Sequence, residues 1–282
     1  MAYLAPAPGM DEFMSSLTKR IITAVVLLIG VGSALYALPA STARYVLGAF
    51  VFIGVWEWSG FFARHSPSIR ALYTLMMFGA GLLPLVTGAS PGAGDPIIYI
   101  AVGWWLVVLC WLVFSSVAIN SWGCALAGLL CLQPAWLSLA RLMNMGEGVP
   151  LLLWFIGIVA AADIGAYFTG RRFGQRKLAP RVSPGKTWEG LGGGLLCAIL
   201  VAVLGASWLN ISLVVFAAVG AAVAGFSIVG DLTVSAFKRY AGLKDSGRLL
   251  PGHGGVMDRI DGMVAALPVF VVTLLLTGVL DA

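Results

Sequence analysis

Nine long stretches of apolar residues run through this sequence, and seven of them contain no charged side chain. Each approaches the roughly 20 residues that an α-helix needs to cross about 30 Å of hydrocarbon. None shows the alternation of apolar and polar residues that marks a membrane β-strand. A helix satisfies its backbone hydrogen bonds internally, as a lipid environment demands. The sequence therefore predicts an all-α fold, a polytopic membrane bundle with spans at 21–38, 45–63, 71–88, 96–118, 122–140, 149–169, 190–209, 211–229 and 263–280.

The composition agrees with a membrane location. Only 10% of the 282 residues are charged and 60% are hydrophobic. A soluble domain carries about a quarter of its residues as Asp, Glu, Lys and Arg to cover its surface. Most of this surface must therefore face lipid, and an ordinary soluble domain is excluded.

The basic residues predict the orientation of the bundle, because cytoplasmic loops of membrane proteins collect Lys and Arg. With nine spans and a cytoplasmic N-terminus, 15 of the 17 basic residues fall on the cytoplasmic side. Only Arg44 and Arg141 fall on the other side. A missing or extra span in the middle would destroy this asymmetry, so we expect nine spans and an external C-terminus.

The chain divides into three parts. We expect residues 1–16 to form a disordered tail, residues 17–148 a five-span membrane region, and residues 149–282 a four-span region with two long loops. These loops, 170–189 and 230–262, both fall on the predicted cytoplasmic side. Loops in compact bundles are usually short, and long ones are often functional.

The two long loops concentrate the polarity of the chain. They contain 11 of the 17 basic residues and, together with Asp163 just before the first loop, six of the 12 acidic residues. One interpretation is that they are solvated, positively charged loops that touch anionic lipid headgroups. The pattern of residues within them favours a functional site instead.

In the second loop, Asp231, Ser235 and Lys238 are spaced i, i+4 and i+7. If the eighth span continues into the cytoplasm, these side chains share one face of its helix. Asp258 and Asp261, at i and i+3, likewise share a face where the ninth span begins. Carboxylates from two helices that meet at the membrane surface suit Mg²⁺, which takes one or two carboxylates plus substrate phosphates and water. For any single Asp, a helix cap or an Arg partner is the alternative.

A glycine-rich turn precedes Asp258. Gly254 and Gly255 permit left-handed backbone angles or close approach, as phosphate-binding segments require. His253 either contacts a phosphate or metal or simply holds the turn. Because no second His or Cys lies nearby, a zinc site is not expected.

In the first loop, Asp163 is embedded about two turns inside the sixth span, where a carboxylate is by default a functional candidate. Arg171 follows at the end of this span. The sequence Gly-Lys-Thr at Lys186 suggests a phosphate-binding P-loop, but Pro180 occupies the position of the first glycine and no strand precedes it. Ser183 either contacts substrate or caps the seventh span.

Two acidic residues have structural alternatives. Glu189 lies one turn from Lys186 and could form an ion pair with it. Glu57, in the second span, is expected to be a buried partner of Arg64 or of the basic loop.

The segment from Ser235 to Asp261 reads Ser-x-x-Lys-Arg-x4-Lys-Asp-x5-Pro-Gly-His-Gly-Gly-x-x-Asp-Arg-x-Asp. This segment resembles the signature of phosphatidate cytidylyltransferases, the CDP-diacylglycerol synthases. The segments Asp163–Gly174 and Ser183–Gly190 also resemble that family, and the similarity covers about residues 155–265.

The resemblance implies a homodimeric enzyme of the bacterial inner membrane with a cytoplasmic active site and no nucleic-acid partner. Its reaction transfers CMP from CTP to phosphatidic acid, giving CDP-diacylglycerol and pyrophosphate. It implies Mg²⁺, with a monovalent cation such as K⁺ beside it, held by Asp231, Asp258 and Asp261. The expected catalytic residues are Asp231, Asp258, Lys238 and Lys186. The expected substrate-binding residues are Asp163, Arg171, Ser183, Glu189, Ser235, Arg239, Lys244, Asp245, His253, Gly254, Gly255 and Arg259.

This chemistry agrees with the residue types in the loops. The phosphate of phosphatidic acid is largely ionised at neutral pH, so it can attack the α-phosphorus of CTP without a general base. Catalysis then depends on alignment and charge neutralisation. Two alternatives stay open: a secondary transporter that uses intramembrane acids such as Asp163 and Glu57, and a cytidylyl- or phosphotransferase acting on another lipid such as a prenol. The polar residues gather in loops rather than at the bilayer midplane, which favours the enzyme.

Overall fold

A computed structural model gives the fold of most of the chain. It describes residues 32, 33, 35, 37–86, 95–114, 119–145, 147–209, 212–249 and 254–278. The predicted tail, most of the first predicted span and His253 lie outside the described residues.

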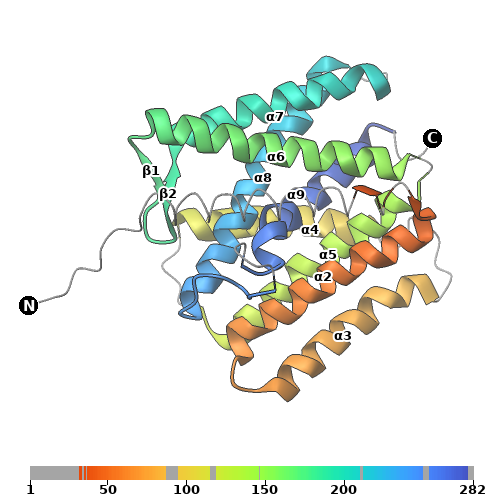
Figure 1. The fold of residues 1–282 in the computed structure, drawn as a ribbon, viewed down its shortest axis with the longest axis vertical. Coiled ribbons are helices and arrows are strands. Elements are labelled where there is room, and N and C mark those ends of the chain that lie inside the picture. The colour runs from red at the N-terminus through yellow and green to blue at the C-terminus, as the bar shows by residue number, and fades with distance from the viewer. Residues whose placement is uncertain are drawn as a thin grey trace, which may run out of the picture.

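The described part consists of eight helices and one β-hairpin (Figure 1). All the helices except α3 are long and apolar enough to cross a membrane, which makes seven candidate spans. The described residues therefore form a multi-pass helical membrane protein. Nine spans and a cytoplasmic N-terminus stay predictions. In chain order the elements are α2 (Ala40–Ala63), α3 (Pro67–Val86), α4 (Asp95–Phe114), α5 (Ser121–Met143), α6 (Gly148–Phe173), β1 (Lys177–Ala179), β2 (Ser183–Thr187), α7 (Trp188–Leu209), α8 (Leu213–Tyr240) and α9 (Met257–Leu276).

The hairpin of β1 and β2 is a departure from the all-α prediction. It occupies the predicted loop 170–189 and pairs antiparallel, with Lys177 opposite Thr187 and Ala179 opposite Ser183. Its second strand contains Ser-Pro-Gly-Lys-Thr, and Pro and Gly are depleted in strands, so the sequence gives little signal of it. An exposed two-stranded ribbon at the end of two long helices can nevertheless tolerate them.

Side-chain caps fix the ends of several helices. Asn120 Oδ1 accepts a hydrogen bond of 2.7 Å from the N–H of Gly123 at the start of α5. At the start of α7, Thr187 Oγ1 accepts a bond of 3.1 Å from the N–H of Gly190. The cap of the seventh span is therefore Thr187 and not Ser183, because the helix begins four residues later than a Ser183 cap requires.

Glycines allow α6 and α7 to pack closely against each other. A Cβ added to Gly194 of α7 would lie 2.7 Å from the carbonyl oxygen of Ala162 on α6. A Cβ added to Gly165 of α6 would lie 2.7 Å from the carbonyl oxygen of Gly193 on α7. Small residues of this kind are the usual basis of close helix packing in membranes. The close contact fixes where α6 presents Asp163 and where the hairpin lies.

Helices α8 and α9 lie between the α6–α7 pair and the α2–α3 pair (Figure 1). Aromatic side chains connect them to both sides. Phe270 of α9 packs on Phe155 of α6, with ring centroids 5.2 Å apart. Phe237 of α8 packs on Trp58 of α2 at 4.9 Å. The two helices that carry the predicted metal ligands are thus the central elements of the bundle.

Candidate active site

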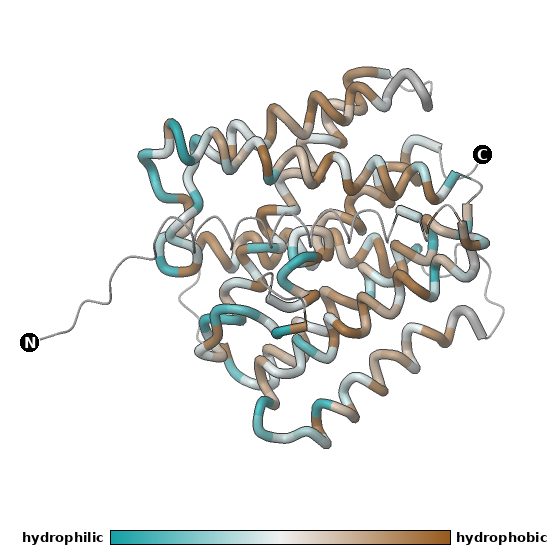
Figure 2. Tube along the Cα trace, viewed as in Figure 1, coloured by the Kyte–Doolittle hydropathy of each residue, from teal (hydrophilic) through white to brown (hydrophobic). Residues whose placement is uncertain are grey.

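The longest hydrophilic segments lie at one end of the bundle (Figure 2). They are the β1–β2 hairpin and the connection between α8 and α9. This connection runs from residue 241 to 256, because α8 continues to Tyr240 and α9 begins at Met257. The helical extension that the sequence suggested for the eighth span is therefore present, and it carries Asp231, Ser235 and Lys238 on α8.

Asp231 forms the first of two Asp–Lys pairs. Its Oδ2 lies 2.5 Å from the Nζ of Lys186, which extends from β2. The hydroxyl of Ser235, one turn along α8, donates a hydrogen bond of 3.2 Å to Asp231 Oδ1. The side chains of Lys186 and Asp231 are 25% and 34% exposed, so solvent and small ligands can reach this pair.

Asp258 forms the second pair, which is buried. Its Oδ1 accepts a hydrogen bond of 2.7 Å from Lys238 Nζ, and the side chains of Lys238 and Asp258 are only 11% and 7% exposed. Asp258 Oδ2 accepts bonds from the N–H groups of Ser246 at 2.8 Å and Gly255 at 3.0 Å. This carboxylate therefore holds together the end of α8, the α8–α9 loop and the start of α9.

Glu57 of α2 anchors the same loop from the other side. Its carboxylate accepts hydrogen bonds from the Ser246 hydroxyl at 2.7 Å and from the N–H groups of Val256 and Met257 at 3.1 and 2.8 Å. Of the two roles predicted for Glu57, a partner of Arg64 or a partner of the basic loop, the structure shows the second. The donors are a hydroxyl and two amides at a helix N-terminus, a position that favours a carboxylate. Basic side chains are not among them.

At the two described glycines of the turn, a side chain is excluded for different geometric reasons. Gly254 has φ of +81°, a left-handed conformation that side chains rarely adopt, and an added Cβ would also lie 2.7 Å from Asp258 Oδ2. At Gly255 an added Cβ would collide with the Glu57 carboxylate and the Ser246 hydroxyl. Both glycines therefore permit the close approach that the sequence predicted, and the groups approached are carboxylates of the protein.

Two more carboxylates lie within electrostatic range of the Lys186–Asp231 pair. Asp231 interacts electrostatically with Asp163 of α6 and with Asp261 of α9, and Lys186 attracts both of these acids as well. Arg259 is a further cation near Asp163. Among the described residues, however, no three His, Cys, Asp or Glu side chains are grouped closely enough to hold a metal ion by themselves. A cation bound here would therefore need ligands from a substrate or from water.

A cavity of about 330 Å³ opens between α6, the hairpin, α7 and α8. Predicted site residues from two separate segments meet in it, since Asp163, Arg171, Lys186 and Asp231 all line its wall. Its other lining residues are Ala166, Tyr167, Gly170, Leu178, Gly185, Thr187, Gly190, Leu191 and Ile228. The cavity combines cations and carboxylates, which suits a phosphorylated ligand that arrives with a metal ion.

Other predicted site residues do not line this cavity. Glu189 accepts hydrogen bonds from the N–H groups of Gln175 and Arg176, so it stabilises the hairpin and does not pair with Lys186. Ser183 is part of β2. Arg239 donates a hydrogen bond of 3.2 Å to the carbonyl oxygen of Leu243. Two further candidates, Lys244 and Asp245, are exposed in the α8–α9 loop.

Sequence reasoning missed one residue of the site, Ser246, and included another, Tyr167, only as part of the family-like segment Asp163–Gly174. Ser246 contacts both Glu57 and Asp258 and so joins the two anchors of the loop. Tyr167 lines the cavity and accepts a hydrogen bond of 3.0 Å from Arg171 Nη1. Tyr167 lies four residues after Asp163 and so on the same helix face, whereas the contact of Ser246 with Glu57 joins residues 189 positions apart and leaves no local pattern.

The fold and the site define a multi-pass membrane protein with a charged cavity at one end of its bundle. A sequence profile described as the cytidylyltransferase family matches residues 18–277. The chain belongs to the cytidylyltransferase family.

Curated relatives cover nearly the whole chain. A phosphatidate cytidylyltransferase of Pseudomonas aeruginosa is 39% identical over 93% of this chain and 98% of its own length. A protein of the same name from Haemophilus influenzae is 37% identical over 90% of this chain and 97% of its own length. A third protein of this name, from Brucella suis, is 35% identical over 90% of this chain and 91% of its own length.

Proposed function

We propose that this protein is a phosphatidate cytidylyltransferase, which transfers CMP from CTP to phosphatidic acid. The products are CDP-diacylglycerol, used in phospholipid biosynthesis, and pyrophosphate. The observation that carries the proposal is the cavity in which Lys186 and Asp231 meet, because it joins the two family-like segments into one charged site in a membrane protein. The names of the relatives over at least 90% of the chain support the same reaction.

The residues of the cavity can position the triphosphate of CTP. Lys186 and Arg171 supply positive charge at the wall, and Lys186 is accessible enough to exchange its contact with Asp231 for a phosphate oxygen. Such contacts would neutralise the negative charge that develops on the pyrophosphate leaving group. The phosphate of phosphatidic acid is itself the nucleophile, so the site needs no serine–histidine pair.

The donor set fits Mg²⁺. Asp231 and Asp261 provide carboxylate oxygens near each other, and Asp258 lies one turn before Asp261 on α9. Mg²⁺ takes only one or two carboxylates and completes its shell with phosphates and water, so the lack of a three-residue cluster among the described side chains is compatible with it. When bound, Mg²⁺ would neutralise phosphate oxygens of CTP and orient them for in-line attack. A monovalent cation such as K⁺ beside it belongs to the same proposal.

The proposal places the site on the cytoplasmic face of the bacterial inner membrane, in a homodimer. The clustering of Lys and Arg at the hairpin and the α8–α9 loop supports this orientation through the positive-inside rule. Arg141 and Arg44, the two exceptions, both belong to the opposite end of the bundle, where Arg141 pairs with Asp95 at 3.3 Å and Arg44 contacts Asn144.

Pyrophosphate release by the purified protein tests the proposal. In detergent micelles, we expect release from CTP only when both phosphatidic acid and Mg²⁺ are present. Release that does not depend on the lipid would contradict the proposed function, as would the absence of release. A transporter would give no release under any of these conditions.

A further inference from the structure

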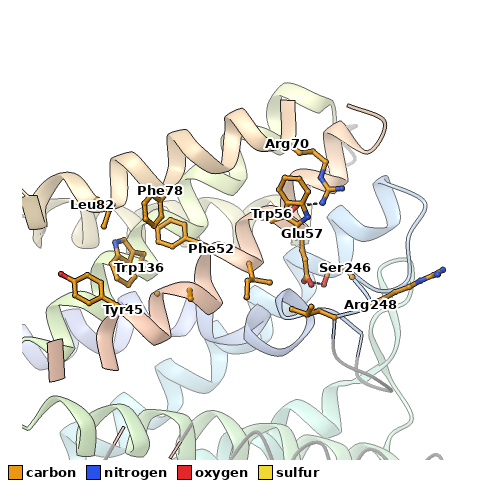
Figure 3. Close-up of a pocket in the computed structure, with 15 residues that line it drawn as sticks. Tyr45, Phe52, Trp56, Glu57, Arg70, Phe78, Leu82, Trp136, Ser246 and Arg248 are labelled. Atoms are coloured by element: carbon orange, nitrogen blue, oxygen red, sulfur yellow. Dashed lines mark hydrogen bonds between the residues drawn. The ribbon is translucent and has the colours of Figure 1, made fainter. Parts of the chain in front are cut away.

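A second cavity, larger than the one beside Lys186 and Asp231, lies away from those residues. It is a groove of about 1150 Å³ between α2, α3 and α5, and the α8–α9 loop closes one of its ends. Most of its wall is aromatic or aliphatic (Figure 3). Three of the aromatic side chains along it, Tyr45, Trp56 and Phe78, are 39–53% exposed, so the groove is open toward its surroundings. In a membrane protein those surroundings are lipid.

The floor of the groove is held rigidly. Trp136 of α5 donates a hydrogen bond of 2.9 Å from Nε1 to the carbonyl oxygen of Gly81 on α3. Phe52 of α2 packs on Trp136 and on Phe78, with ring centroids 5.8 and 4.8 Å apart. These contacts fix α3 relative to α2 and leave a preformed apolar channel.

The length of the groove matches one leaflet of a bilayer. From Tyr45 to Trp56 it follows α2 for 11 residues, which is about 16 Å at 1.5 Å per residue. Half of the hydrocarbon thickness of a bilayer is about 15 Å. An acyl chain that starts at the headgroup level can therefore lie along the groove for its full length.

One end of the groove is polar and carries two arginines. The guanidinium of Arg70 stacks on Trp56 at 4.2 Å and donates to the carbonyl oxygen of Trp56 and to Ser59 Oγ. A guanidinium has five N–H donors, so these two bonds leave others available for a ligand. Arg248, exposed in the α8–α9 loop, is the second cation at this end.

Glu57 also lines this end and attracts Arg70 electrostatically, but its carboxylate oxygens are already occupied by hydrogen bonds. Its side chain is buried and faces the loop, where it accepts hydrogen bonds from Ser246, Val256 and Met257. The exposed charges at the mouth are therefore positive, which is complementary to a lipid phosphate.

We propose that this groove holds an acyl chain of phosphatidic acid, with the lipid phosphate at the Arg70 and Arg248 end. This inference rests on the proposed function and assigns the lipid subsite to the N-terminal helices. The same loop that borders the mouth through Ser246, Gly247 and Arg248 is bound by Asp258 through the Ser246 N–H. A phosphate at the mouth would therefore lie against the same loop that Asp258 binds.

Filling the groove tests the inference by kinetics. Ala49 is exposed on α2 and lines the groove, so Ala49→Phe should block it. Each buried methylene contributes about fourfold to affinity, so displacing two of them should raise KM for long-chain phosphatidic acid more than tenfold. We expect KM for CTP to be unchanged. Ala80→Phe is the matched control, because Ala80 is exposed on α3 but does not line the groove.

Photolabelling of the unmodified protein is a second test that does not depend on a variant folding correctly. Phosphatidic acid with a diazirine at the end of one acyl chain should label α2 and α3 near Tyr45, Phe78 and Leu82, in the absence of CTP. Excess unlabelled phosphatidic acid should suppress that labelling.

The outcomes separate the inference from the proposed function. If the unmodified protein turns over but Ala49→Phe leaves KM for the lipid unchanged, the groove assignment alone is wrong. Labelling confined to other helices, or crosslinks from the groove to residues 21–31 or to a second copy of the chain, would also overturn it. If the unmodified protein releases no pyrophosphate with phosphatidic acid, both proposals are overturned.

Discussion

The two Asp–Lys pairs of the site are expected to contribute very differently to stability. Lys238 and Asp258 are 11% and 7% exposed, whereas Lys186 and Asp231 are 25% and 34% exposed. Replacing one partner of a buried pair leaves an uncompensated charge in a medium of low dielectric constant. We therefore predict that Asp258→Asn strongly destabilises the protein and that Asp231→Asn does not.

The magnitude follows from the contacts of Asp258. Breaking a buried ion pair costs about 3–5 kcal/mol. Asparagine at this position keeps one oxygen acceptor for the N–H groups of Ser246 and Gly255, so we expect a loss at the lower end of that range, about 3 kcal/mol. For a partly exposed pair such as Lys186 and Asp231, the expected contribution to the free energy of unfolding is about 0–1 kcal/mol.

Double-mutant cycles measure these energies directly. The first cycle combines Lys238→Met with Asp258→Asn, and the matched control cycle combines Lys186→Met with Asp231→Asn. Free energies of unfolding would come from titration with SDS in mixed micelles, followed by tryptophan fluorescence. We expect a coupling energy of at least about 2 kcal/mol for the buried pair and below about 1 kcal/mol for the control.

Two results would refute this reasoning. Coupling energies of the same size in both cycles would mean that burial does not set the strength of the pair. An Asp258→Asn protein as stable as the unmodified one would mean that this carboxylate does not hold the loop.

Three further predictions concern turnover and packing. Asp231→Asn should lower kcat for pyrophosphate release by at least about 100-fold with an unchanged melting temperature, and near-normal activity at saturating Mg²⁺ would disprove its role. Lys186→Ala should raise KM for CTP about tenfold, because a charge-assisted contact to phosphate is lost; unchanged KM and kcat would show that Lys186 is only structural. Gly194→Ala should destabilise the protein by about 1–3 kcal/mol, since its Cβ would lie 2.7 Å from the carbonyl oxygen of Ala162. Gly192→Ala, where an added Cβ meets open space, is its control, and equal melting temperatures for both variants would contradict the close packing of α6 and α7.

Helix positions could be predicted because a long apolar run in a membrane protein has only one stable local structure. The predicted spans 45–63 and 149–169 both lie within observed helices, α2 and α6. Their ends were harder to predict. Helix α8 continues into the predicted loop as far as Tyr240. Its polar residues Ser235 and Lys238 are buried there, because they bind carboxylates of the site instead of water.

The hairpin could not be predicted, since its strands are short and Ser-Pro-Gly-Lys-Thr has no β-type pattern. Its presence changes the role of Lys186. The sequence placed this lysine in the loop 170–189 with Glu189 as a possible ion-pair partner, but the strand directs it across to Asp231, 45 residues away in the chain.

Segments of the site were predictable and their pairings were not. Motif spacing identified Lys238 and Asp258 as functional candidates, yet nothing in the spacing shows that they bind each other. Glu57 was expected to be a buried partner of Arg64 or of the basic loop, and it binds that loop through the Ser246 hydroxyl and the N–H groups of Val256 and Met257. Contacts to backbone N–H groups leave no trace in a sequence pattern, because every residue except proline has one.

The fate of labelled CTP tests the central claim most directly. With phosphatidic acid and Mg²⁺ present, the proposed reaction should move radiolabel from the α-phosphate of CTP into the lipid fraction and radiolabel from the γ-phosphate into pyrophosphate. A γ-label recovered in lipid would identify a phosphotransferase, and no label in lipid from either position would exclude an enzyme of this kind.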